Sequence, residues 1–262
     1  MKILITAALP YVNNVQHLGH IVGCHLPGDI FARFCRIRGD DVAFVGGSDA
    51  HGTPIEVAAR KAKEDTNDFA NKNHEIHKKE LSWFNMSYDI FGKTNSIEHH
   101  KTTLEFFNKL YKNGHIKEDE ITMPYCEKDK MFLPDRYVEG KCPQCGNIAR
   151  GDQCDCGYIL ESPAELIDPY CTICKTKPEI RKTKHLFITF DKIEPELTKW
   201  IEENKVRWNA LTYGVAKSWI DKGLKPRAIT RDIDWGVKVP IKGFENKVFY
   251  VWFDAPIGYV TF

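Results

Sequence analysis

Seven of the nine cysteines of this 262-residue chain fall between positions 126 and 174, at spacings that suit a metal ion. Cys142 and Cys145 form one pair, followed by Gly146, and Cys154 and Cys156 form another. Two thiolates separated by two residues can bind one ion around a tight turn, and glycine adopts the backbone conformation that such a turn needs. The two pairs therefore predict a tetrahedral, structural zinc site in which no position is open to water.

A second cysteine pair, Cys171 and Cys174, needs further ligands. Cys126 is one candidate, and Asp129, three residues after it, is another, because zinc accepts carboxylate oxygen. The alternative is three buried or free thiols. The odd number of cysteines and their spacing favour metal binding over disulfides, and the number of zinc ions stays open between one and two.

Two histidines, His17 and His20, follow a buried apolar strand and open a helical pattern. Residues three apart on a helix face the same way, and the first helical turn offers free N–H groups to an anion. The pair therefore predicts a phosphate site, and Gly19 would let a flat group such as a purine approach the backbone. The alternative is two histidines that cap the helix or pack against it.

These histidines belong to a longer pattern. Leu-Pro-Tyr-x-Asn followed by His-Leu-Gly-His resembles the ATP signature of the class I aminoacyl-tRNA synthetases, and residues 8–14 resemble the methionyl-tRNA synthetases among them. Three more segments resemble that family: 47–54 (GSDAHGTP), 229–232 (ITRD) and 250–259 (YVWFDAPIGY). The resemblance covers the whole chain, and the conjunction of the four segments makes it specific.

The resemblance implies a two-step reaction. ATP, carried with Mg²⁺, activates L-methionine to methionyl adenylate, and the acyl group then passes to the 3′ end of tRNA(Met) for translation initiation and elongation. Nucleotidyl transfer depends mainly on positioning and on charge stabilisation. We therefore expect His17, Gly19 and His20 to bind ATP, and His17, His20 and Arg231 to act catalytically. Arg231 has a structural salt bridge as its alternative.

The methionine site is also implied by the resemblance. Thioethers favour aromatic edges, and an ammonium group needs a carboxylate, for which Asp49 is the candidate. Without the resemblance, the aromatic run would be interpreted as core and Asp49 as the cap of the next helix. The expected methionine-binding residues are Leu9, Tyr11, Asp49, Trp252, Ala255, Pro256 and Tyr259.

The chain departs from the family in three places. A lysine-rich Lys-Met-Ser-Lys-Ser loop and an anticodon-binding domain are not found in these residues, so we expect a fragment that binds methionine weakly. The pair Cys154 and Cys156 has a one-residue spacer where the family usually has two. Asp129 stands where two-zinc relatives tend to carry cysteine.

The hydrophobic pattern predicts how these residues are positioned. Strands are expected at 2–8, 41–45, 88–91 and 247–253, and helices at 17–38, 53–63, 67–83, 96–113, 194–204 and 211–222. Pro27 should kink the first helix, whose apolar stripe would be Ile21, Ile30, Phe31, Phe34 and Ile37. From residue 116 to about 184 periodicity is weak, which indicates a region built around ligands rather than around a core.

The alternation of strands and helices predicts an α/β fold: an open parallel Rossmann-type sheet, the first part of a class I synthetase catalytic domain, interrupted by a zinc-knuckle insertion. We expect the nucleotide-binding part at 1–115, the connective insertion with its zinc knuckles at 116–225, and the return with the methionine-pocket strand at 226–262.

The composition excludes some classes of protein. Lys and Arg number 37 against 36 Asp and Glu, so a strongly basic nucleic-acid coat is excluded. Apolar runs are too short for a membrane span, so we expect a cytoplasmic protein without a membrane partner.

The alternative functions are those of class I synthetases for leucine, isoleucine, valine or cysteine, and that of a zinc-knuckle interaction module without catalysis. The first three would need a larger insertion, the cysteine enzymes keep zinc in the pocket, and the module leaves the His-Leu-Gly-His element unexplained.

Overall fold

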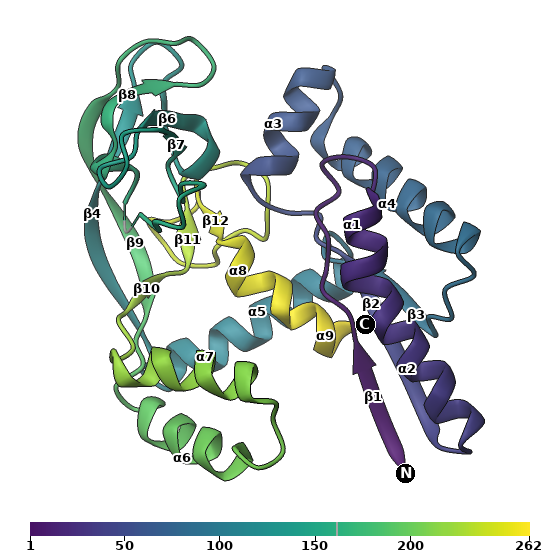
Figure 1. Cartoon of the computed structure of the whole chain (residues 1–262). Helices are drawn as coiled ribbons and strands as arrows, with labels where there is room; N and C mark the ends of the chain where they lie inside the picture. The colour runs from purple at the N-terminus through teal and green to yellow at the C-terminus, as the bar shows by residue number, and fades with distance from the viewer. Residues whose placement is uncertain (161) are drawn as a thin grey trace.

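A three-stranded parallel sheet forms one side of the computed structural model, which describes residues 1–160 and 162–262 (Figure 1). Its order is β1 (Lys2–Thr6), β2 (Asp41–Ser48) and β3 (Ile90–Lys93), so each crossover adds the next neighbour. Lys2 pairs with Asp41 and Val45 with Ile90. Both connections contain helices, as parallel neighbours require, and the expected open α/β sheet is confirmed.

The helices of this part begin and end at recognisable signals. They are α2 (Leu26–Ile37), α3 (Thr53–Ala62), α4 (Thr66–Trp83) and α5 (Ile97–Lys112). Asp65 caps α4 and Ser96 caps α5 through side-chain oxygens that accept backbone N–H groups. Gly114, just beyond α5, has φ +72°, a conformation that ends a helix and that glycine adopts without strain.

The first predicted helix is irregular. A short turn, α1 (Leu18–His20), leads into a π-helical turn, η1 (Ile21–His25), before α2 begins. Pro27, at the start of α2, cannot donate to the carbonyl of Gly23, so the regular hydrogen-bond ladder is interrupted where the sequence predicted a kink.

The predicted apolar stripe of this helix is wrong for four of its five members. Only Ile21 is buried, whereas the side chains of Ile30, Phe31, Phe34 and Ile37 are 50–87% exposed. The face against the sheet carries small residues instead, Ala32 and Cys35, and a Cβ at Gly28 would lie 2.9 Å from the Phe44 ring. Because the helix lies close to the sheet, only small side chains fit between them. The hydrophobic pattern alone therefore predicted the wrong face of the helix as the buried one.

The insertion contains a long ladder that weak periodicity did not predict. Strand β4 (Ile116–Cys126) pairs antiparallel with β9 (Glu179–Ile188), and β5 (Met131–Phe132) and β10 (Arg227–Ala228) extend this sheet. A smaller sheet consists of β7 (Ile148–Arg150), β6 (Val138–Lys141) and β8 (Ile167–Cys171). The 3₁₀ turns η2 (Asp135–Tyr137) and η3 (Pro163–Glu165) accompany it.

The expectation that the insertion lacks a core is also wrong. Leu133, Tyr137 and Val138 are fully buried, and they pack in one cluster with buried cysteines. Cysteine is a small hydrophobic residue when buried, so the same residues that carry the metal-binding pattern contribute to the core.

The chain returns to the sheet through a pair of helices and a short ladder. Helices α6 (Glu194–Asn204) and α7 (Ala210–Asp221) precede β11 (Thr230–Arg231), which pairs antiparallel with β12 (Val248–Phe249). The predicted strand 247–253 is therefore mostly wrong, because helix α8 (Val251–Asp254) begins two residues after β12, followed by η4 (Ala255–Ile257) and α9 (Gly258–Thr261). Aromatic residues favour strands, but here the pairing with β11 ends at Tyr250, whose N–H donates to the Ile229 carbonyl, and the backbone becomes helical from Val251.

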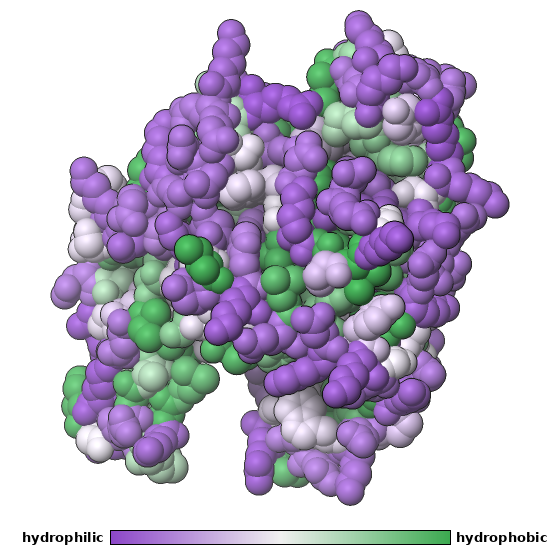
Figure 2. Space-filling view, turned by 180° about the vertical axis from the view of Figure 1, so that it is seen from behind, coloured by the Kyte–Doolittle hydropathy of each residue, from purple (hydrophilic) through white to green (hydrophobic). Residues whose placement is uncertain are grey.

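The C-terminal segment lies between the parallel sheet and the insertion (Figure 1). A second core joins α5 to this segment through Phe107 and Phe249, whose ring centroids are 4.8 Å apart. The face turned away in Figure 1 is mostly hydrophilic, with hydrophobic side chains gathered near its middle, and is notched at its lower edge (Figure 2). Within the described residues, the helices are too short or too polar to cross a bilayer.

Candidate active site

Two of the sequence motifs meet at the carboxyl end of the sheet. Tyr11 and Asp49 form an isolated parallel bridge beyond the ends of β1 and β2. The Val12 N–H donates to the Asp49 carbonyl at 3.1 Å, and the Asp49 N–H donates to the Pro10 carbonyl at 2.9 Å. Ligands bind at this edge of open α/β sheets, so the backbone itself holds these motifs where a ligand site is expected.

A pocket opens beside this bridge. Three predicted site residues line it, Tyr11, Arg231 and Trp252, and the Trp252 side chain is 67% exposed. The pocket therefore brings together residues more than 200 positions apart in the sequence. Its other lining residues are Gly52, Thr53, Pro54, Asp135, Arg136, Asp152, Ile233, Tyr250 and Val251.

The remaining predicted methionine binders lie around the pocket rather than in its lining, within the part of the chain that the structure describes. Asp49, which forms the bridge with Tyr11, is buried, Pro256 is exposed, and Leu9 and Tyr259 are half-buried. Leu9 lies close to the α9 backbone, since a Cβ at Gly258 would come within 3.1 Å of it. Ala255 is likewise half-buried, at the start of η4.

Asp49 has an unusual electrostatic environment. Burial raises the pKa of its carboxyl group well above the ordinary value, and the nearby Asp254 carboxyl raises this pKa further. The His51 N–H, 3.2 Å away, donates to Asp49 Oδ1 and acts in the opposite direction. Two buried carboxyl groups near each other favour a cation between or beside them.

A buried histidine cluster, which the sequence analysis missed, supports this region. His51 Nδ1 lies 2.7 Å from Asp254 Oδ2, and His51 Nε2 lies 3.2 Å from His100 Nε2. Burial lowers the pKa of His51 to about 3 and raises that of Asp254, so both groups favour their neutral forms. The pair ties the Asp49 segment to the segment that carries Trp252.

This cluster is better described as a hydrogen-bonded network than as a metal centre. His51, His99 and Asp254 offer ligand atoms within 4.8 Å of one another. A tetrahedral ion with ligands at about 2.0–2.1 Å separates those ligands by roughly 3.3 Å. The 2.7 Å contact between His51 and Asp254 is shorter than that and matches a hydrogen bond.

The two histidines of the ATP signature stack on each other, with ring centroids 3.9 Å apart. His17 caps α1: its Nδ1 accepts the Gly19 N–H at 3.0 Å, and the His17 N–H donates to His20 Nδ1 at 3.3 Å. The capping alternative therefore holds, although the exposed face of His17 is still open to a ligand. Gly19 is required locally, because a Cβ there would lie 2.7 Å from the His17 ring.

The charge state of His20 depends on its surroundings. Burial, together with the neighbouring His17, lowers the pKa of His20 below its ordinary value. The ring therefore favours its neutral form near pH 7, in which one ring nitrogen still donates a hydrogen bond.

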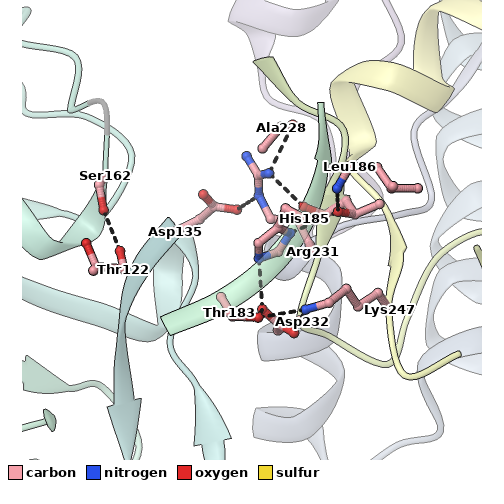
Figure 3. Close-up of polar contacts among 11 residues, drawn as sticks. Thr122, Asp135, Ser162, Thr183, His185, Leu186, Ala228, Arg231, Asp232 and Lys247 are labelled. Atoms are coloured by element: carbon pink, nitrogen blue, oxygen red, sulfur yellow. Dashed lines mark hydrogen bonds and ion pairs between the residues drawn. The ribbon is translucent and has the colours of Figure 1, made fainter. Parts of the chain in front are cut away.

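Arg231 lines the pocket, as Arg136 does, and Figure 3 shows its polar contacts. Its guanidinium carbon lies 3.7 Å from the Tyr250 ring centroid, and its Nη1 donates to the carbonyls of Ala228 and Thr230. Its Nε lies 3.5 Å from Asp135 Oδ2, so the salt-bridge alternative is also present. Arg231 can therefore form the ion pair with Asp135 and line the pocket at the same time.

A buried polar network lies next to Arg231 (Figure 3). His185 contacts both Thr230 at 2.9 Å and Asp232 at 3.0 Å, and Lys247 donates to Thr183 and pairs with Asp232. Although burial acts to raise it, contacts with His185 and Lys247 lower the pKa of Asp232 and favour its ionised form. This network fixes β9 against β11, and therefore fixes the strand that carries Arg231.

The first cysteine cluster has the dimensions of a zinc site. The sulfur atoms of Cys142 and Cys156 are 3.9 Å apart, and those of Cys145 and Cys154 are 3.6 Å apart. Four sulfurs at about 2.3 Å from one zinc ion are roughly 3.8 Å apart, so the residues fit the ion, the one-residue spacer included. Gly146 has φ +75°, the left-handed conformation expected in this turn.

The second cluster is also assembled, and it is tighter. Cys126, Asp129, Cys171 and Cys174 offer atoms within 4.8 Å of one another. Asp129 Oδ2 lies 3.2 Å from the sulfurs of both Cys126 and Cys171, and the Cys126 and Cys174 sulfurs are 3.3 Å apart. A zinc ion would require these atoms to separate by a few tenths of an ångström.

Sequence reasoning missed the contributions of His51, Asp254, Asp135 and Tyr250. The first two and Tyr250 lie inside the motifs that carried the resemblance, so the signal was present without a role attached to it. Asp135 carried no signal, since it lies between Pro134 and Arg136 in the insertion.

The fold is that of a class I synthetase catalytic domain. A methionyl-tRNA synthetase from Mycobacterium tuberculosis in complex with methionyl-adenylate superposes with a TM-score of 0.73 at 24% identity, over 99% of this chain and 46% of that one. A second structure of the enzyme from this organism, bound by methionyl-adenylate, gives a TM-score of 0.72 at 23% identity.

The sequence comparisons define the family. The profile described as tRNA synthetases class I (M) matches residues 3–262, and the chain belongs to this family. It is 49% identical to the methionine--tRNA ligase of Borreliella afzelii over 260 residues, and 48% identical to that of Parabacteroides distasonis over 262. It spans 36% and 38% of the lengths of these two relatives.

Proposed function

We propose that the chain contributes the methionine and ATP site of a methionine--tRNA ligase. Family membership supports the class of reaction, and one observation carries the assignment to this site. The pocket joins an aromatic wall, Tyr11 and Trp252, to an arginine, Arg231, and Tyr11 forms a backbone bridge with Asp49, whose carboxyl group is buried. These are the groups that a zwitterionic amino acid with an apolar side chain requires.

Methionine recognition follows from the charges. The ammonium group of the substrate would lie against Asp49, whose pKa is raised by burial and by the nearby Asp254 carboxyl group. The thioether would lie against Tyr11 and Trp252, which offer polarizable aromatic surface. We assign Leu9, Ala255, Pro256 and Tyr259 to the surroundings of this side chain.

Activation joins the methionine carboxylate to the α-phosphate of ATP. A carboxylate oxygen attacks the α-phosphorus, and the bond to pyrophosphate breaks. We assign to Arg231 the stabilisation of the negative charge that the carboxylate and the α-phosphate share. We assign to His17, Gly19 and His20 the binding of the nucleotide. His20 would act as a neutral hydrogen-bond donor, since its pKa is lowered. A hydroxyl group at the 3′ end of tRNA(Met) then attacks the carbonyl carbon, and AMP leaves.

We infer that the insertion binds structural zinc. Cys142, Cys145, Cys154 and Cys156 would hold one ion, and Cys126, Asp129, Cys171 and Cys174 a second. With four protein ligands each, these ions would supply stability rather than Lewis acidity. We assign residues 1–115 and 226–262 to the catalytic part, 116–225 to the connective insertion, and the whole protein to the cytoplasm.

Tryptophan fluorescence tests the proposed substrate. L-Methionine, L-leucine, L-isoleucine and L-cysteine are titrated into the chain and into a Trp252→Phe variant, with Trp83→Phe as the matched control for an exposed tryptophan elsewhere. We expect a saturable change with methionine alone, lost in Trp252→Phe and retained in Trp83→Phe. Saturation by leucine, isoleucine or cysteine in preference to methionine would refute the assignment.

A further inference from the structure

Asp135 has a strained backbone and a half-buried side chain at the wall of the pocket. It begins η2 with φ +47°, a region that residues other than glycine seldom adopt. Its carbonyl accepts the Gly151 N–H at 2.8 Å, and a Cβ at Gly151 would lie only 2.7 Å from that oxygen. Local packing therefore imposes this conformation, and the conformation turns the carboxylate toward Arg231.

The contact between Asp135 and Arg231 bridges two parts of the chain that are 96 positions apart. Asp135 Oδ2 lies 3.5 Å from Arg231 Nε, and both side chains are 18% exposed. Burial raises the pKa of Asp135, while the Arg231 charge acts to lower it. A half-desolvated pair of this kind restricts the guanidinium more than a surface ion pair does.

Other contacts restrict the guanidinium of Arg231. Its carbon lies 3.7 Å from the centroid of the Tyr250 ring. Its Nη1 donates to the carbonyls of Ala228 and Thr230, and Figure 3 shows the contact with Ala228. Asp135 holds the Nε edge from the side of the insertion. Asp135, Arg231 and Tyr250 line the pocket together with Tyr11 and Trp252.

The turn that carries Asp135 is itself firmly anchored. Tyr137, the last residue of η2, is fully buried in the core of the insertion, and Arg60 of α3 lies over its ring at 5.7 Å. Thr172, inside the second cysteine pair, donates its N–H to the Tyr137 carbonyl at 2.9 Å and its hydroxyl to the Arg136 carbonyl at 3.3 Å. The insertion therefore places Asp135 as a rigid element.

We propose that Asp135 is a positioning residue that holds Arg231 against Tyr250, so that the guanidinium meets the carboxylate of the bound amino acid. This inference rests on the proposed function, because the ligand carboxylate is that of methionine. It gives the insertion a role in substrate recognition, since the insertion supplies the carboxylate and the return segment supplies the arginine.

The test compares ligands with and without a carboxylate. L-Methionine and L-methioninol, which lacks that group, are titrated by tryptophan fluorescence into the full chain and into Asp135→Asn. Asp135→Glu serves as the conservative rescue. Asp152→Asn is the matched control, because Asp152 also lines the pocket but contacts Arg136 at 3.8 Å. Thermal unfolding verifies that each variant is folded.

We expect Asp135→Asn to weaken methionine binding roughly 10-fold or more, with methioninol binding unchanged within about twofold. Asp135→Glu should restore part of the loss, and Asp152→Asn should leave the ratio of the two affinities unchanged. An equal loss for both ligands, or no loss for either, would overturn the proposal.

A direct probe separates this inference from the proposed function. In ¹⁵N NMR spectra of the chain without ligand, the Nε–H signal of Arg231, assigned with Arg231→Lys, should be protected from exchange with water. Asp135→Asn should remove that protection, and Asp152→Asn should not. If the wild-type chain binds neither ligand, the proposed function fails for this chain, and an unchanged Arg231 signal in Asp135→Asn would still overturn the positioning role.

Discussion

Substitution of Cys145 provides a sharp test of the insertion, because its side chain is exposed while its sulfur belongs to the first cluster. Replacing an exposed thiol by a hydroxyl changes packing little, so any large effect of Cys145→Ser must come from a lost metal ligand. We expect the wild-type chain to hold two zinc ions and Cys145→Ser to hold one ion tightly.

The magnitude follows from the geometry of the cluster. The sulfur separations of 3.9 and 3.6 Å bracket the roughly 3.8 Å expected for four thiolates on zinc, so the site is preformed and each ligand contributes fully. Structural zinc sites bind with about 10–16 kcal/mol at pH 7, so one thiolate of four accounts for about 3 kcal/mol. Cys145→Ser should therefore weaken zinc binding at this site on the order of 100-fold.

The assay is competition with a chromophoric chelator, combined with elemental analysis of the dialysed protein. Cys24→Ser is the matched control, because Cys24 is half-buried and lies outside both clusters. X-ray absorption at the zinc edge should give a shell dominated by sulfur at about 2.3 Å. A wild-type chain without zinc, or a Cys145→Ser variant that retains two ions at unchanged affinity, would refute the reasoning.

Three further predictions concern the pocket and the core. Asp49→Asn should weaken methionine binding by roughly 30-fold or more in the fluorescence titration, because a buried ammonium would lose its carboxylate. Phe107→Ala should lower the free energy of unfolding in urea by about 3–5 kcal/mol, since this ring is fully buried, whereas Phe106→Ala, at a 38% exposed position, should cost far less. Lowering the pH from 7 to 5 should destabilise the folded chain. Its buried histidines have pKa values of about 3–4 in the folded state and about 6.5 in the unfolded state, so the unfolded chain binds protons first as the pH falls. Their contribution to the free energy of unfolding is therefore complete above pH 6.5 and is lost as the pH falls toward 3. We expect a loss of roughly 1–2 kcal/mol per histidine, seen as a lower urea midpoint. The raised carboxyl pKa values of Asp49 and Asp254 offset part of this loss. The histidines concerned are His25, His51, His74, His99 and His100.

The parallel sheet and its helices were predictable because each is defined by local sequence. Strand β1 is a short apolar run, and α4 and α5 follow capping residues, Asp65 and Ser96, that identify their first turns. The cysteine clusters were predictable for the same reason, since short spacings within one turn carry the metal-binding pattern.

Features that depend on distant partners were not predictable from local patterns. The orientation of α2 depends on how closely Gly28 approaches Phe44, and the aromatic strand at Val248–Phe249 ends where its pairing with residues 229–231 ends, just before the helix at Val251. The role of Asp135 depends on Arg231, 96 positions away. Such contacts are tertiary, and they override the intrinsic preferences of the residues involved.

The long β4–β9 ladder has a consequence for how the pocket folds. Asp49 and Asp254 are separated by more than 200 positions, and closing so long a loop directly would be entropically costly and slow. Pairing Ile116 with Ile188, and Ile188 with Arg227, brings the returning chain back to the end of α5 in two shorter closures. The ladder therefore holds the returning chain near the sheet during folding. If the insertion folds late, the pocket should also form late, in the slowest phase of refolding.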